Sequence, residues 1–155
     1  MTRPSILWIA IVDGEHARFV QPDGNNVLRS VHVVDSASAH LRSHELGADR
    51  PGRSFESAAS ARHAIGERHD PHDMEKQKFA RHIAGELNAA AERGDFDALL
   101  LVAPSHAMQA LRDGLDAAVQ AKLIGALEKD LVKISDHELL PHVRDWVLPE
   151  RRVFV

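Results

Sequence analysis

Two uninterrupted runs of apolar residues constrain the fold of this chain most. The first covers residues 6–12 and the second residues 97–103, in which Asp97 precedes the apolar residues 98–103, and both are rich in branched side chains and are followed by turn-forming residues. Runs without polar alternation are typical of strands buried on both faces, which lie between layers of helices. With 155 residues, 44% of them hydrophobic and 27% charged, the chain can build one such domain. The runs therefore predict an α/β domain.

The residues after the first run predict an antiparallel sheet. Residues 13–16 are a short turn before a second apolar stretch at residues 17–20, as in a β-hairpin. Another turn at residues 22–26, rich in Gly, Asn and Asp, precedes residues 27–34, where apolar and polar side chains alternate. The first third of the chain is therefore predicted to form a three-stranded antiparallel meander.

Helices and strands are predicted to alternate in the second half. Asp70 suits an N-cap, Pro71 the first helical position, and Gly94 the end of a long amphipathic helix. The apolar run at residues 97–103 follows as a strand, and Ser105 is predicted to cap the next helix. Strand, helix and strand in this order predict parallel pairing in the sheet.

The C-terminal residues carry a weaker pattern. Residues 123–127 fit either the end of a helical stripe or a strand, and their periodicity does not separate the two. Ser135 and Glu138 have the spacing of a capping box, which predicts a last short helix. Residues 1–146 are assigned to one domain. Residues 147–155 are assigned to a tail that forms an edge strand or docks on a partner subunit, giving a homo-oligomer.

Residues 36–71 form a polar segment with four large apolar side chains but six serines and four histidines. Such a composition buries too little apolar area to offset the entropy of ordering, so a long flexible loop before the main helix is predicted. Its ligand-binding candidates share a Pro-Gly turn with basic and aromatic neighbours; they are Arg50, Gly52, Arg53, Ser54, Phe55 and Arg62. Guanidinium groups suit phosphate, and an aromatic ring suits stacking on a base. Alternatively, Phe55 anchors the segment and its arginines pair with nearby acids.

Two candidates for metal chemistry compete with simpler interpretations. His69 and His72 lie near acids and have side chains that bind zinc, iron or manganese, although capping explains the acids of this junction equally well. Asp13, at the end of the first strand, is a candidate for a metal-dependent hydrolase, but a turn-forming role before Gly14 is favoured. Because the chain has no cysteine, thiolate metal sites and iron–sulfur clusters are excluded, and no cofactor is expected.

The charge and the N-terminal sequence bear on location and partners. The formal charge is −4, and protonation of all 11 histidines would change it to +7. Because five of these histidines lie in or next to the polar segment, we expect it to bind polyanions better near pH 6. The first apolar run is too short for a signal peptide or a membrane span, so a cytoplasmic protein without membrane partners is expected.

Several short motifs together resemble the bacterial host attachment protein family over residues 5–143. They are residues 49–55, Arg62-His63, Asp70-Pro71-His72, residues 99–104 and residues 128–131. The resemblance implies similarity to the middle domain of archaeal and eukaryotic peptide-chain release factors and Pelota, a ribonuclease H-like mixed sheet. It also favours a strand for residues 123–131. The Gly-Gly-Gln tripeptide with which release factors hydrolyse peptidyl esters is absent from this sequence.

Three functional hypotheses follow from the residues and the resemblance. The first is a noncatalytic domain that contacts the ribosome or RNA through Arg50, Arg53 and Phe55. The second is a metal-dependent hydrolase that uses Asp13 or the histidine and aspartate cluster. The third is an interaction module that acts indirectly in attachment to host cells, as the family name suggests.

Overall fold

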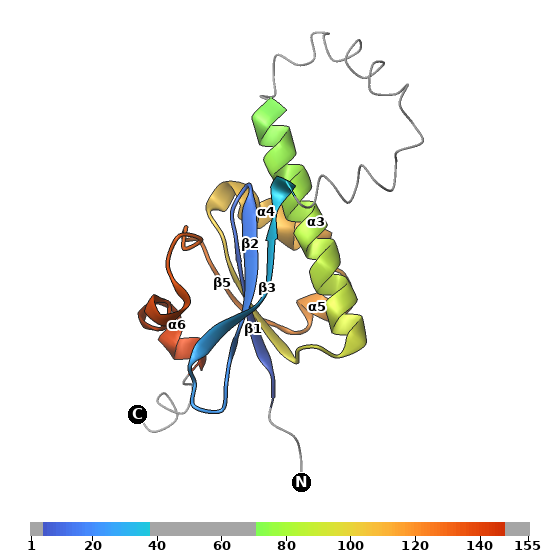
Figure 1. Cartoon of the computed structure of the whole chain (residues 1–155). Helices are drawn as coiled ribbons and strands as arrows, with labels where there is room; N and C mark the ends of the chain where they lie inside the picture. The colour runs from blue at the N-terminus through green and yellow to red at the C-terminus, as the bar shows by residue number, and fades with distance from the viewer. Residues whose placement is uncertain (1–4, 38–70, 148–155) are drawn as a thin grey trace.

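The computed structural model describes residues 5–37 and 71–147 as a mixed sheet between two layers of helices (Figure 1). The strands are β1 (Leu7–Val12), β2 (His16–Pro22), β3 (Leu28–Asp35), β4 (Ala98–Val102) and β5 (Leu123–Leu127). The helices are α3 (Pro71–Arg93), α4 (Ser105–Gly114), α5 (Ala117–Gln120), the 3-10 turn η2 (Asp136–Glu138) and α6 (Leu140–Val147). The arrangement confirms the predicted α/β class.

The five strands form one open sheet in the order β3-β2-β1-β4-β5. The pairs β1–β2 and β2–β3 are antiparallel, as predicted for the meander. The pairs β1–β4 and β4–β5 are parallel, and the chain reaches β4 through α3 and β5 through α4 and α5. Residues 123–127 are therefore a strand, which selects one of the two interpretations that the sequence left open.

Aspartates stabilise both turns of the meander. The carboxylate of Asp13 accepts hydrogen bonds from the backbone N–H groups of Glu15 (2.8 Å) and His16 (2.6 Å), which confirms its turn-forming role. The carboxylate of Asp23 accepts from the N–H groups of Val27 and Asn25 in the second turn. These two backbone hydrogen bonds lower the pKa of Asp23 below its usual value, with a smaller contribution from Arg29.

The helix ends follow the sequence signals with one correction. Gly94 adopts a φ of 78° directly after α3, a conformation that favours glycine, and so ends that helix as predicted. Ser105 is not the N-cap of α4: it is the first helical residue, and Pro104 takes the cap position. The carbonyl of Pro104 accepts from the N–H groups of Ala107 and Met108, so the helix begins there without a side-chain cap.

The sheet buries an apolar core on each face. Trp8, Phe19 and Leu101 point to the face that α3, α4 and α5 cover, and they pack against helix residues such as Ile83 and Leu87. The other face carries a second core, built by Ile9, Ile11, Val20, Leu100 and Val102 with the C-terminal side chains Leu131, Leu139, Val143 and Val147. This double coverage explains why the two central strands are continuous apolar runs.

The C-terminal residues differ from prediction in two details. The predicted capping box does not form: the hydroxyl of Ser135 donates to the carboxylate of Glu138 at 3.0 Å and accepts no backbone hydrogen bond as a cap. A short helix follows as predicted, but Val147, assigned to the tail, is its last residue and is buried. No helix within residues 5–37 and 71–147 is long and apolar enough to cross a membrane.

Candidate functional site

Most of the residues that the sequence proposes for ligand binding lie outside the described residues. These are Arg50, Gly52, Arg53, Ser54, Phe55, Arg62 and His69. His72 belongs to the first turn of α3, but its side chain also lies outside the described part. Their roles therefore stay predictions. The described domain instead brings together a group of residues that sequence reasoning did not connect.

A pair of histidines shares one carboxylate between β3 and α3. His32 Nε2, from the edge strand β3, lies 3.2 Å from Glu86 Oε1, and His82 Nε2 lies 2.9 Å from Glu86 Oε2. His82 and Glu86 are four residues apart on α3, so helical spacing by itself brings these two side chains together. The contact with His32 spans 54 positions and depends on how β3 packs beside the helix.

These three side chains bind one another rather than a common point. Each imidazole contacts a different oxygen of Glu86, so the carboxylate lies between the two rings. No group of three or more potential metal donors in the described segments has an arrangement that would hold an ion. Asp97, the acid directly before β4, accepts a hydrogen bond from the N–H of Ile6 at 2.8 Å and so joins β4 to the start of β1.

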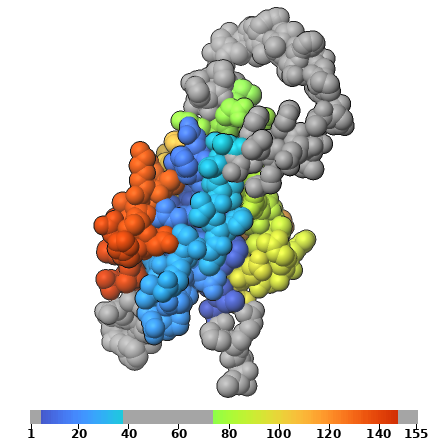
Figure 2. All heavy atoms as spheres, in the orientation of Figure 1, coloured from blue at the N-terminus to red at the C-terminus, as the bar shows by residue number. Residues whose placement is uncertain are grey.

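A cavity of about 300 Å³ opens next to the histidine pair. Strands β1, β2 and β3 provide one wall, and the C-terminal half of α3 with the following turn provides the other. Its lining comprises Trp8, Phe19, Gln21, Val31, His32, Glu86, Ala90, Arg93 and Asp95. Figure 2 shows β3 on the molecular surface between α6 and α3, so this cavity lies at the accessible edge of the sheet.

Three rings form the aromatic wall of the cavity. The ring centroids of Trp8 and Phe19 are 5.2 Å apart, and those of Phe19 and His32 are 5.5 Å apart. Trp8 and Phe19 are almost fully buried, whereas the side chain of His32 is 49% exposed. The row therefore leads from the core to an imidazole that a ligand can reach.

Gln21 presents an oriented amide to the same cavity. Its side-chain oxygen accepts a hydrogen bond from Trp8 Nε1 at 3.0 Å. Because the oxygen is engaged with the indole, the NH₂ group is the end of the amide that remains to donate to a ligand.

Arg93 lies at the opening and pairs with Asp95 at 2.9 Å, while its side chain remains 62% exposed.

Two exposed cations lie in the first half of α3. Lys78 and Arg81 are exposed and three residues apart, which places them side by side on the helix surface. Within the described ranges neither of them forms a salt bridge. They lie seven and ten residues after Pro71, the last residue of the polar segment.

Comparisons with known proteins identify one related family. A family model described as "Protein required for attachment to host cells" matches residues 8–143 of the chain. A search of curated proteins finds no match. The matched region includes every strand except the first residue of β1, both faces of the sheet and the cavity between the sheet and α3.

Proposed function

The chain belongs to the family of proteins required for attachment to host cells, and from this premise we propose that it is a noncatalytic domain that binds RNA, including the RNA of the ribosome. In this proposal Arg50 and Arg53 contact phosphate groups and Phe55 stacks on a base. Gly52 and Ser54 shape the turn between them, and Arg62 adds a further cation. Attachment to host cells then depends on the protein indirectly, through gene expression in the cytoplasm.

The exposed pair Lys78 and Arg81 is the observation that carries the proposal. Cations that are engaged with acids have to give up those partners before they neutralise phosphates, whereas this pair forms no salt bridge within the described residues. The pair lies on an ordered helix that begins where the polar segment ends. A phosphate backbone that contacts Arg50 and Arg53 would therefore find additional positive charge along α3.

The acid proposed for hydrolysis at the end of the first strand has structural partners. Asp13 accepts two backbone hydrogen bonds in its turn. These contacts favour binding over a hydrolase built on Asp13. We further infer a ribonuclease H-like, release-factor-like fold, supported by the antiparallel meander that is followed by parallel strands. The missing Gly-Gly-Gln tripeptide favours contact with RNA without peptide release.

The proposal is tested by RNA binding and ribosome co-sedimentation at low and moderate salt. We expect Lys78→Ala/Arg81→Ala and Arg50→Ala/Arg53→Ala each to weaken binding, and each lost contact to reduce the slope of log affinity against log salt by about 0.7 for single-stranded RNA. The control Lys129→Ala/Lys133→Ala removes the same charge from exposed residues beside the other sheet face. Equal binding by all three variants and the unaltered protein would refute the proposal.

A further inference from the structure

The cavity beside β3 has a lining that the phosphate contacts of the proposed function do not use. We propose that it binds a single nucleobase with its attached ribose and phosphate. As a site for an RNA nucleotide the inference rests on the proposed function, whereas as a site for a free nucleotide it does not. Four features of the cavity favour this ligand: its size, its aromatic wall, its hydrogen-bonding groups and the charge at its opening.

The size of the cavity selects a small ligand. Its volume of about 300 Å³ lies at the lower end of the range for ligand pockets, roughly 300–1,000 Å³. Walls on two sides, β1 to β3 and α3, favour a flat molecule over a branched one. One base with its sugar meets both requirements, whereas two stacked nucleotides would extend beyond the lining residues.

His32 provides the stacking surface. Proteins that recognise unpaired bases place them on aromatic or histidine rings. The imidazole of His32 is half exposed, is tilted by 32° to the ring of Phe19, and is held on its other side by Glu86. Contacts from two elements thus restrict the rotation of the ring before a ligand arrives, which reduces the entropy lost on binding.

Gln21 and Glu86 supply complementary hydrogen-bonding groups. The amide of Gln21 is oriented by Trp8 so that its NH₂ group can donate to a carbonyl or ring nitrogen of a base. The carboxylate of Glu86 lines the same cavity, and its oxygens are hydrogen-bond acceptors, the complement of the N–H groups on a base. Every nucleobase has two flat faces that can stack and an edge that carries hydrogen-bond donors or acceptors.

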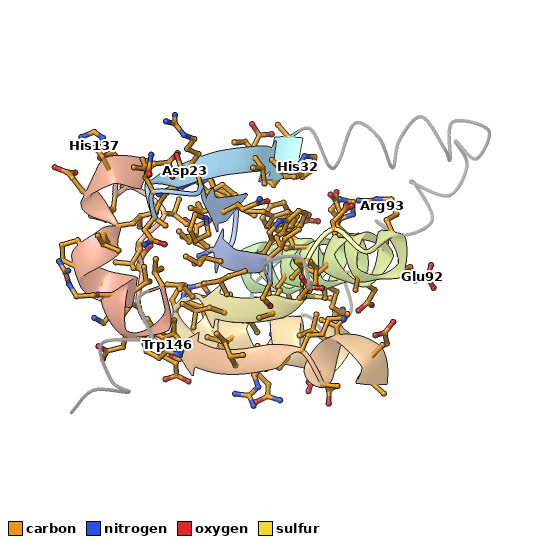
Figure 3. The ribbon with its side chains drawn as sticks, turned by 90° about the horizontal axis from the view of Figure 1, so that it is seen from below. Asp23, His32, Glu92, Arg93, His137 and Trp146 are labelled. Atoms are coloured by element: carbon orange, nitrogen blue, oxygen red, sulfur yellow. The ribbon has the colours of Figure 1, made fainter. Side chains whose placement is uncertain are left out.

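Arg93 is placed to bind the phosphate. Helical spacing puts residues 82, 86 and 93 on one side of α3. Figure 3 shows Arg93 and His32 on the same side of the ribbon, whereas Glu92 is directed away from them. An exposed ion pair such as Arg93 with Asp95 is weak, so a phosphate can replace the carboxylate as partner of the guanidinium. The ribose then spans the distance between the stacked base and the opening.

Trp8 allows a direct binding assay, because it lines the cavity and the chain has only one other tryptophan, Trp146. In a Trp146→Phe background, we expect adenosine, guanosine, cytidine or uridine monophosphate to quench Trp8 emission saturably. His32→Ala should weaken the binding about tenfold. The control Val33→Ala changes the neighbouring exposed residue on the other sheet face, opposite Arg18, and should leave affinity unchanged.

A second variant, Gln21→Met, removes the amide donor and nearly preserves the length of the side chain. Thermal melts establish that each variant is folded. Absence of quenching by all four mononucleotides, or equal affinities for His32→Ala and Val33→Ala, overturns the cavity proposal. RNA binding without mononucleotide quenching overturns the cavity but not the proposed function. Quenching without RNA binding overturns the proposed function and assigns the cavity to a free nucleotide.

Discussion

Replacing Asp136 by alanine is expected to lower the free energy of unfolding by about 2–4 kcal/mol. The carboxylate of Asp136, from η2, accepts hydrogen bonds from the N–H and the hydroxyl of Ser30 on β3, each at 2.8 Å. It also lies 3.2 Å from Nε of Arg18 on β2. The guanidinium of Arg18 in turn donates to the carbonyls of Val132 and Ile134. One acid thus joins two strands to the C-terminal part of the chain.

The magnitude follows from the groups left without a partner. A hydrogen bond to a charged group contributes about 1.5–3 kcal/mol, and the variant loses two. The contact with Arg18 Nε is within ion-pair distance but outside hydrogen-bond geometry, so its contribution is electrostatic. The side chains of Arg18 and Asp136 are 15% and 32% exposed, so water replaces part of the lost contacts. The total therefore lies below a simple sum and below the cost of breaking a fully buried pair.

Urea denaturation followed by circular dichroism measures this change. The matched control is Asp145→Ala, an exposed aspartate on the neighbouring helix α6, for which we expect less than about 0.5 kcal/mol. A double-mutant cycle with Ser30→Ala isolates the coupling across 106 positions of sequence. If Asp136→Ala and Asp145→Ala unfold at the same urea concentration, the inferred contribution of this contact is wrong.

Four further outcomes are expected. Gly114→Ala should lower the free energy of unfolding by about 1–3 kcal/mol, because the added Cβ would lie 2.8 Å from Cβ of Ala84. Gly85→Ala places its Cβ in open space and should raise the free energy of unfolding by up to about 1 kcal/mol. Thermal melts should therefore show shifts of opposite sign for the two variants. The pKa of Asp23 is lower in the folded state than its ordinary 3.8, so its contribution is present above that pH and is lost as pH falls through the folded value; Asp23→Asn should flatten the acid side of the stability curve in urea titrations. RNA affinity at fixed salt should be higher at pH 6 than at pH 8, because the segment's histidines gain charge, and a flat profile would contradict this. Zinc or manganese should not shift the melting temperature of tag-free protein; a shift that His69→Ala removes would instead support the metal site.

The sequence predicted those parts of the fold that depend on local patterns. The apolar runs, the turn aspartates, Pro71 and Gly94 identified the strands and the main helix because each acts within a few residues. Ser105 was assigned wrongly because a serine after a strand has the pattern of a cap, and the actual cap depends on the carbonyl of Pro104. Residues 123–127 needed their parallel neighbour β4 to be identified as a strand.

The candidate site shows the same division more sharply. The sequence by itself determined that two buried strands form the centre of the domain, that a polar segment connects β3 to α3, and that this segment contains several arginines. Only the tertiary structure brought His32 to Glu86, Gln21 to Trp8, and all four to one cavity. Hydrophobic periodicity specifies which face of a strand or helix is buried. Contacts between side chains of different strands and helices depend on which of these elements become neighbours in the fold, and no local sequence pattern encodes that arrangement.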